Sequence, residues 1–98
     1  MKCKIIYSQR FLAELRQIAR FIALDSKSRA KEFSESVKQS CQNLVDMPYK
    51  CRKSLKFDDE SVRDLICKGY VIPYLIKDDC INILGIYKEN VWEAKEQG

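Results

Sequence analysis

The chain has 98 residues, which is enough for one compact domain and too few for a second catalytic domain. Its composition is 46% hydrophobic and 33% charged with three glycines and two prolines, which predicts a folded globular chain and excludes a disordered one. The formal net charge of +4 permits an acidic partner or a nucleic acid without requiring either, so charge alone selects no function.

Residues 4–24 predict one strand followed by a helix. Residues 4–7 form a short β-prone run, and Ser8 suits the N-cap of a helix. Apolar residues then recur at spacings of three and four from Gln9 to about Leu24, which predicts an amphipathic helix. The apolar side of this helix consists of Phe11, Leu12, Leu15, Ile18, Ala19 and Ile22.

A second helix follows the polar residues 25–28 and continues until Met47 and Pro48 end it. Two helices joined by so short a turn are expected to pack antiparallel. The repeated apolar positions of the second helix are Ala30, Phe33, Val37, Cys41, Leu44 and Val45.

Residues 49–60 show no regular period and mix both charges, which is typical of a loop between the helices and a sheet. A solvated loop and a binding patch are both open interpretations of this segment. Its basic residues are Lys50, Arg52, Lys53 and Lys56, and its acidic residues are Asp58, Asp59 and Glu60.

Three strands are predicted after this loop, at residues 62–67, 70–76 and 80–87, and tight turns between them predict a meander. Pro73 lies inside the second run. Because proline cannot donate to a strand ladder, we expect an edge, a bulge or a position facing away from a partner strand there. The layout predicts an α+β fold in one domain, residues 1–98, with an N-terminal strand, an antiparallel two-helix hairpin on one face of the sheet, and a three-stranded antiparallel meander.

The cysteine and histidine content limits the metal-binding chemistry that the chain can support. The chain has five cysteines without a Cys-x-x-Cys pair and has no histidine, so the usual structural zinc ligands are missing and neither a metal nor a cofactor is expected. We interpret Cys41, Cys67 and Cys80 as core or near-core side chains. An odd number of thiols, without a secretory signal or an apolar run near the roughly 20 residues of a bilayer span, predicts a cytosolic protein.

A set of features recurs along the two helices and the predicted meander. They are Arg63 in the first strand, Gly69 and Tyr70 followed by Tyr74, the Asp78-Asp79 turn, the isoleucine-rich last strand, and the helix end from Leu44 to Pro48. In these features residues 62–87 resemble the C-terminal sheet of the ParE/RelE toxin superfamily of type II toxin–antitoxin systems. The paired helices are also similar to those of this superfamily, so the resemblance covers nearly the whole chain.

The superfamily has a ribonuclease branch and a ParE branch, and one departure from the superfamily pattern bears on the choice between them. In the ribosome-dependent ribonuclease branch, similar to RelE, an arginine belongs to the site for the message phosphate, and Val71 occupies its place here. Asp64 puts a carboxylate where that branch tends to be basic. RNA cleavage through the 2′-hydroxyl needs a base, a cation and an acid. No catalytic residue is assigned, and the candidates for such a set are Arg63, Tyr87 and Lys88.

The ParE branch, which the helices and final strands also resemble, implies a toxin that inhibits DNA gyrase by binding, needs no catalytic set and serves plasmid stabilisation and bacterial growth inhibition. Two alternatives stay open: a RelE-like ribosome-dependent mRNA endonuclease, and a non-toxic interaction module with the same fold. Each candidate for binding a target or an antitoxin also has a structural interpretation, as a core edge or an ordinary surface residue. These candidates are Arg63, Tyr70, Tyr74, Tyr87, Lys88 and Trp92.

The resemblance also implies a cognate antitoxin, a flexible segment of which adds a helix or strand over exposed apolar surface. The implied target is gyrase, with the ribosome and mRNA as the alternative, and no membrane partner is expected. A homodimer and a toxin–antitoxin hetero-oligomer are both open. Covering an open sheet edge would stabilise so small a fold.

Overall fold

Ser8 joins the first strand to the first helix in the computed structural model, which describes residues 4–54, 57 and 59–88. Strand β1 (Lys4–Tyr7) precedes it and helix α1 (Gln9–Ala23) follows it. The Ser8 hydroxyl accepts a hydrogen bond from the Phe11 N–H at 3.0 Å, as an N-cap does, and donates one to the Leu84 carbonyl at 3.0 Å. This serine therefore fixes the start of α1 to the last part of the sheet.

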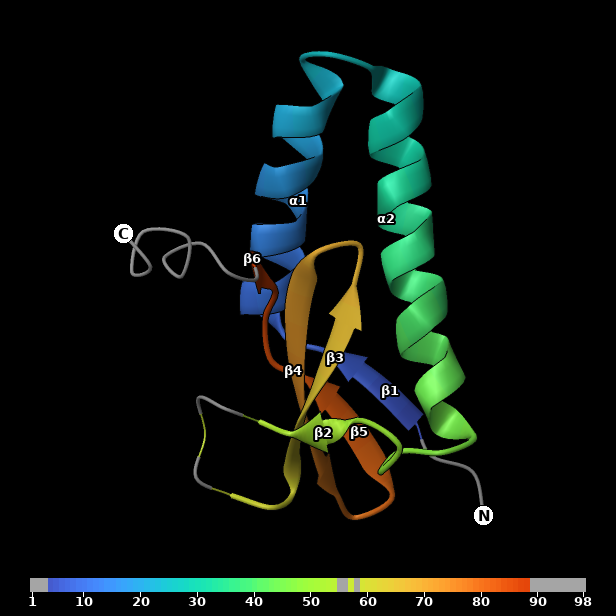
Figure 1. Ribbon diagram of the computed structural model, residues 1–98, viewed down its shortest axis with the longest axis vertical. Coiled ribbons are helices and arrows are strands. Elements are labelled where there is room, and N and C mark those ends of the chain that lie inside the picture. The colour runs from blue at the N-terminus through green and yellow to red at the C-terminus, as the bar shows by residue number, and fades with distance from the viewer. Residues whose placement is uncertain (1–3, 55–56, 58, 89–98) are drawn as a thin grey trace, which may run out of the picture.

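The two helices form the predicted antiparallel hairpin (Figure 1). Helix α2 (Lys27–Gln42) begins after Ser26, whose hydroxyl accepts a hydrogen bond from the Arg29 N–H at 3.2 Å. The chain then tightens into a 3₁₀ turn, η1 (Asn43–Val45), before Pro48 prevents the helix from continuing. The two helices are therefore confirmed, with the second ending in a tighter turn.

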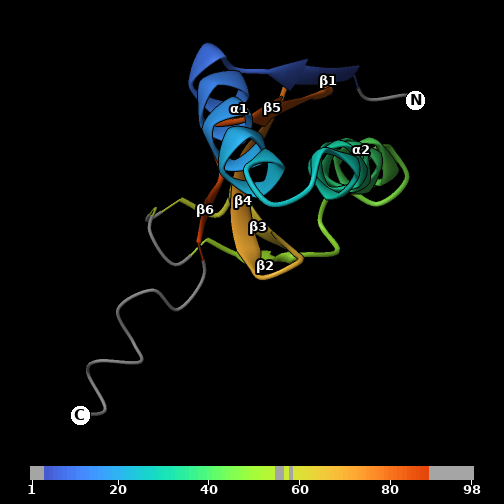
Figure 2. The ribbon, with the colours of Figure 1, turned by 90° about the horizontal axis from the view of Figure 1, so that it is seen from above.

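Six strands form one sheet in the described residues. The order is β1-β5-β4-β3-β2, and β6 also pairs with β4 (Figure 2). Strand β1 runs parallel to β5, whereas the other pairs are antiparallel. The remaining strands are β2 (Arg52–Lys53), β3 (Val62–Cys67), β4 (Tyr70–Lys77), β5 (Cys80–Ile83) and β6 (Tyr87–Lys88).

The meander β3-β4-β5 confirms the predicted strand order, with two corrections. The segment predicted as a loop contains β2, which is too short and polar to show a period of its own. The predicted strand at 80–87 is two strands, because residues 84–86 leave the ladder.

Pro73 lies opposite this break. On one side, β3 pairs with β4 without interruption from Val62 to Cys67. On the other side, the Leu84 N–H donates to the Pro73 carbonyl at 2.8 Å, just where β5 stops pairing and before β6 begins. The carbonyl and nitrogen of a strand residue face the same neighbour, so the missing N–H of Pro73 faces the break. The irregularity expected at Pro73 therefore lies in the partner strand.

The core lies between the helices and one face of the sheet. Cys41 and Cys67 are buried and Cys80 is half-buried, which agrees with their interpretation as core or near-core residues. None of the described helices is long and apolar enough to cross a membrane. The buried cluster consists of Phe11, Leu15, Phe33, Val37, Cys41, Leu44, Leu65, Cys67, Ile72, Tyr74, Ile81, Ile83 and Ile86.

Candidate partner-binding site

Arg63 holds the segment before β3 against the sheet. Its Nε donates to the Glu60 carbonyl at 3.1 Å, and its Nη1 donates to the Cys51 carbonyl at 3.2 Å. The guanidinium also lies over the ring of Tyr49, 5.0 Å from the centroid. Within the described residues, the hydrogen bonds of its side chain go to this segment. Arg63 is therefore engaged structurally, although its side chain stays half-exposed.

Tyr74 is fully buried in the core, at 0% exposure. Its hydroxyl donates a hydrogen bond of 2.7 Å to the Pro48 carbonyl, across the junction between the helices and the sheet. Burial is the largest cause that raises the pKa of this hydroxyl above its ordinary value of 10.0. A side chain in this position cannot contact a partner directly, so Tyr74 is a packing residue and leaves the group of binding candidates.

Tyr70 and Lys88 meet at the opposite end of β4. The Tyr70 ring packs edge-on against Phe33 of α2, with the ring centroids 5.3 Å apart. Lys88 on β6 pairs with Tyr70 across the strands, and its Nζ lies 5.5 Å from the centre of the Tyr70 ring. Lys88 is exposed and Tyr70 is half-buried, so the pair presents to solvent a positive charge that lies over an aromatic ring.

The strand register separates Tyr87 from these residues. Tyr87 pairs with Val71, whereas Lys88 pairs with Tyr70, and successive strand residues point to opposite faces of a sheet. Tyr87 therefore belongs to the face away from the helices, and Lys88 to the face toward them. Trp92, the remaining candidate, lies outside the described residues.

The three candidates for a ribonuclease set are thus not gathered. Arg63 pairs with Tyr74, which lies four residues along β4 from Tyr70, the partner of Lys88. Four residues of strand span about 13 Å. Arg63 and Lys88 attach to opposite edges of β4 at that separation, and Tyr87 belongs to the other face. A single scissile phosphate cannot lie within hydrogen-bond reach of all three in this arrangement.

Asp64 belongs to the face away from the helices. Its side chain is buried, and its Oδ2 lies 3.5 Å from the Nη2 of Arg52 on β2. The carboxylate therefore fastens the short edge strand and is not open to a substrate. Lys56 and Asp58 of the segment 49–60 lie outside the described residues. In the part of the chain that the structure describes, no three His, Cys, Asp or Glu residues gather as metal ligands.

A carboxylate that bonds to the sheet and two exposed apolar side chains were not identified from the sequence. Glu14 lies outside the apolar side of α1, yet its Oε1 accepts the Ile86 N–H at 2.9 Å and so holds the break between β5 and β6. Phe21 on α1 and Leu24 at its C-cap are exposed apolar residues. The sequence could have indicated their exposure, because both residues fall outside the apolar side of the helix.

A short strand, a helical hairpin and a mainly antiparallel sheet define a small α+β protein. The family model of the ParE toxin of type II toxin–antitoxin systems, parDE, matches residues 5–90, so the chain belongs to this family. The resemblance to the ParE/RelE superfamily is confirmed.

Two solved structures share the fold. A chain of the chromosomal ParDE system from P. aeruginosa is 18% identical, with a TM-score of 0.75 over 89% of this chain and 96% of that one. A mutant of the E. coli toxin RelE in the free state is 19% identical, with a TM-score of 0.62 over 98% of this chain and 90% of that one. These likenesses support the predicted α+β fold. No curated protein matches the sequence.

Proposed function

We propose that this ParE-family toxin inhibits DNA gyrase by binding it, in the cytoplasm, and that a cognate antitoxin neutralises it. The separation of Arg63, Tyr87 and Lys88 carries this proposal, because it favours binding over bond cleavage. Family membership supports the toxin–antitoxin context. In the solved P. aeruginosa structure, the similar chain comes from a ParDE system.

The antitoxin has suitable surface to cover. Strands β1 and β2 are the two ends of the strand order, and a flexible segment gains main-chain hydrogen bonds when it extends such an edge. Ile6 on β1 is 42% exposed, so an apolar side chain accompanies one of these edges. Covering β1 would bury this side chain and provide hydrogen-bond partners for the backbone N–H and C=O groups on the outer edge of the strand.

The test is supercoiling of relaxed plasmid DNA by purified gyrase, with the purified chain added in increasing concentration. We expect dose-dependent loss of supercoiling, and restoration of activity when the product of the adjacent antitoxin reading frame is added. The parallel assay is cleavage of ribosome-bound mRNA, for which we expect no product. Message cleavage that is lost in a Lys88→Ala variant, with gyrase unaffected, would contradict the proposal and support the RelE-like alternative.

A further inference from the structure

The far end of the helical hairpin exposes two large apolar side chains. Phe21 is 74% exposed and Leu24 is 85% exposed, whereas Ile18 and Ile22 on the same helix are half-buried against the core. Phe21 and Leu24 are three residues apart, so they lie on one side of the helix. Neither adds to the core of this chain, and exposure of both has a cost in solubility.

The segment that contains this apolar pair is rich in cationic side chains. Residues 16–31 carry five Lys or Arg residues and one carboxylate, so this segment accounts for the whole formal net charge of +4. Arg16 and Arg20 share an arc of about 140° on α1 with Phe21 and Leu24, at 100° per residue. The five cations are Arg16, Arg20, Lys27, Arg29 and Lys31, and all are exposed.

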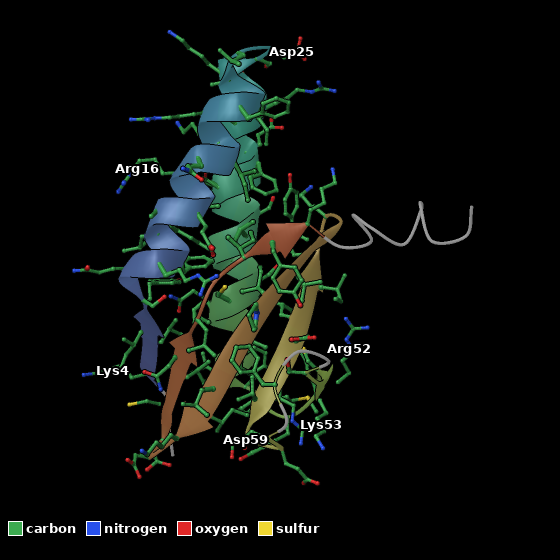
Figure 3. All side chains as sticks on the ribbon, turned by 90° about the vertical axis from the view of Figure 1, so that its left-hand side faces the viewer. Lys4, Arg16, Asp25, Arg52, Lys53 and Asp59 are labelled. Atoms are coloured by element: carbon green, nitrogen blue, oxygen red, sulfur yellow. The ribbon has the colours of Figure 1, made fainter. Side chains whose placement is uncertain are left out.

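The hairpin end projects beyond the sheet (Figures 1 and 3), with Arg16 on the side of α1 and Asp25 at the extreme tip. A narrow convex feature of this kind fits a recess in a larger, folded partner. A flexible wrapping segment gains more from a sheet edge, where it can form main-chain hydrogen bonds.

We propose that the tip surface, defined as Arg16, Arg20, Phe21, Leu24 and Lys27, is the part of this toxin that docks against the apolar side wall of an acidic recess on its target. The inference rests on the proposed function, in which the target is gyrase. Phe21 and Leu24 pack on the apolar wall, and the cations meet carboxylates around it, in the arrangement of an apolar centre within a charged border.

Charge and position disfavour the other occupants of this surface. A second copy of the chain would bring two positive segments together, which is repulsive. An anionic bilayer would attract the cations, but Asp25 and the polar turn would have to enter the lipid ahead of Phe21 and Leu24.

The experiment measures half-inhibition of gyrase supercoiling by two double variants, Phe21→Gln/Leu24→Gln and Arg16→Gln/Arg20→Gln. Glutamine is a good helix former, so both variants keep the helix, and their melting temperatures are measured beside the wild type. The matched controls are Met47→Gln, which removes an exposed apolar side chain elsewhere, and Lys38→Gln/Lys53→Gln, which removes two exposed cations elsewhere.

We expect each tip variant to need at least tenfold more protein for half-inhibition, and the controls to match the wild type. A wild type that leaves supercoiling unaffected would contradict the proposed function and this inference together. Wild-type inhibition that both tip variants retain would overturn the inference alone. Tip-dependent pelleting with phosphatidylglycerol vesicles, or tip-dependent self-association in sedimentation, alongside unchanged gyrase inhibition, would overturn it in favour of a lipid surface or a second copy.

Discussion

At the scale of single residues, the hydroxyl of Tyr74 ties the chain that leaves the helices to the centre of the sheet. Replacing Tyr74 with Phe removes its 2.7 Å hydrogen bond to the Pro48 carbonyl while keeping the buried ring. We expect the free energy of unfolding to fall by about 1 kcal/mol, the usual net contribution of such a bond. Urea unfolding measures this loss.

The control for Tyr74→Phe is Tyr49→Phe, which removes a hydroxyl from an exposed side chain and should change stability by less than about 0.5 kcal/mol. Gyrase inhibition by folded Tyr74→Phe should equal that of the wild type. A Tyr74→Phe protein with full stability and lost inhibition would show that the residue acts on a partner, against its packing role.

Cys41 makes stability depend on alkaline pH. Burial, followed by the nearby Cys67, raises the pKa of the Cys41 thiol from 9.0 to about 12. Between these values the unfolded chain loses a proton that the folded chain keeps. Raising the pH through this window therefore favours the unfolded chain, by up to about 1.4 kcal/mol per pH unit for this thiol.

Urea unfolding under reducing conditions, at about pH 8 and about pH 10.5, measures this dependence. Cys41→Ala should lower stability at the lower pH, because it leaves a small cavity, and should lose less stability than the wild type as the pH rises. Val37→Ala, which leaves a cavity in the same helix without removing a thiol, should keep the slope of the wild type. Equal slopes for Cys41→Ala and the wild type would contradict the assignment to Cys41.

At the scale of secondary-structure elements, the junction between β5 and β6 depends on Gly85. A Cβ added at this position would lie 2.8 Å from Glu14 Oε1, the atom that accepts the Ile86 N–H. The carboxylate is the flexible end of its side chain, so it can move, but the hydrogen bond to Ile86 is then lost. We expect Gly85→Ala to destabilise the chain by about 1 to 2 kcal/mol in urea unfolding.

A double-mutant cycle identifies the cause. In the Glu14→Ala background the hydrogen bond is already absent and the space is open, so Gly85→Ala should cost less than it does in the wild type. Equal costs in both backgrounds would show that Gly85 acts through its own backbone and not through Glu14.

At the scale of the whole molecule, a small fold with open sheet edges and an exposed apolar tip is expected to depend on its antitoxin. Expression of the chain alone should arrest growth or give poorly soluble protein, and co-expression with the adjacent antitoxin should restore both growth and yield. Colony counts and the soluble fraction measure the outcome. Robust growth with abundant unpartnered protein would count against both the toxin and the antitoxin dependence.

Local patterns in the sequence were sufficient for the elements that have a strong period or a clear signal. The helices followed from the spacing of residues such as Phe11 and Leu15, and an irregularity at Pro73 was expected from its missing N–H. The two-residue strand β2 was not predictable, because it exists only where β3 supplies its partners. The division of the last strand likewise depends on Glu14, which is distant in the sequence.

The sequence by itself determined the α+β class, the order of the main strands and the family, because these depend on periodicity, turns and motifs that are local along the chain. Only the tertiary structure decided which candidates could act together. It buried Tyr74, engaged Arg63 with the segment before β3, and put Tyr87 on the face opposite Lys88. Burial and the register between strands arise when distant segments pack, and no spacing within one segment encodes them.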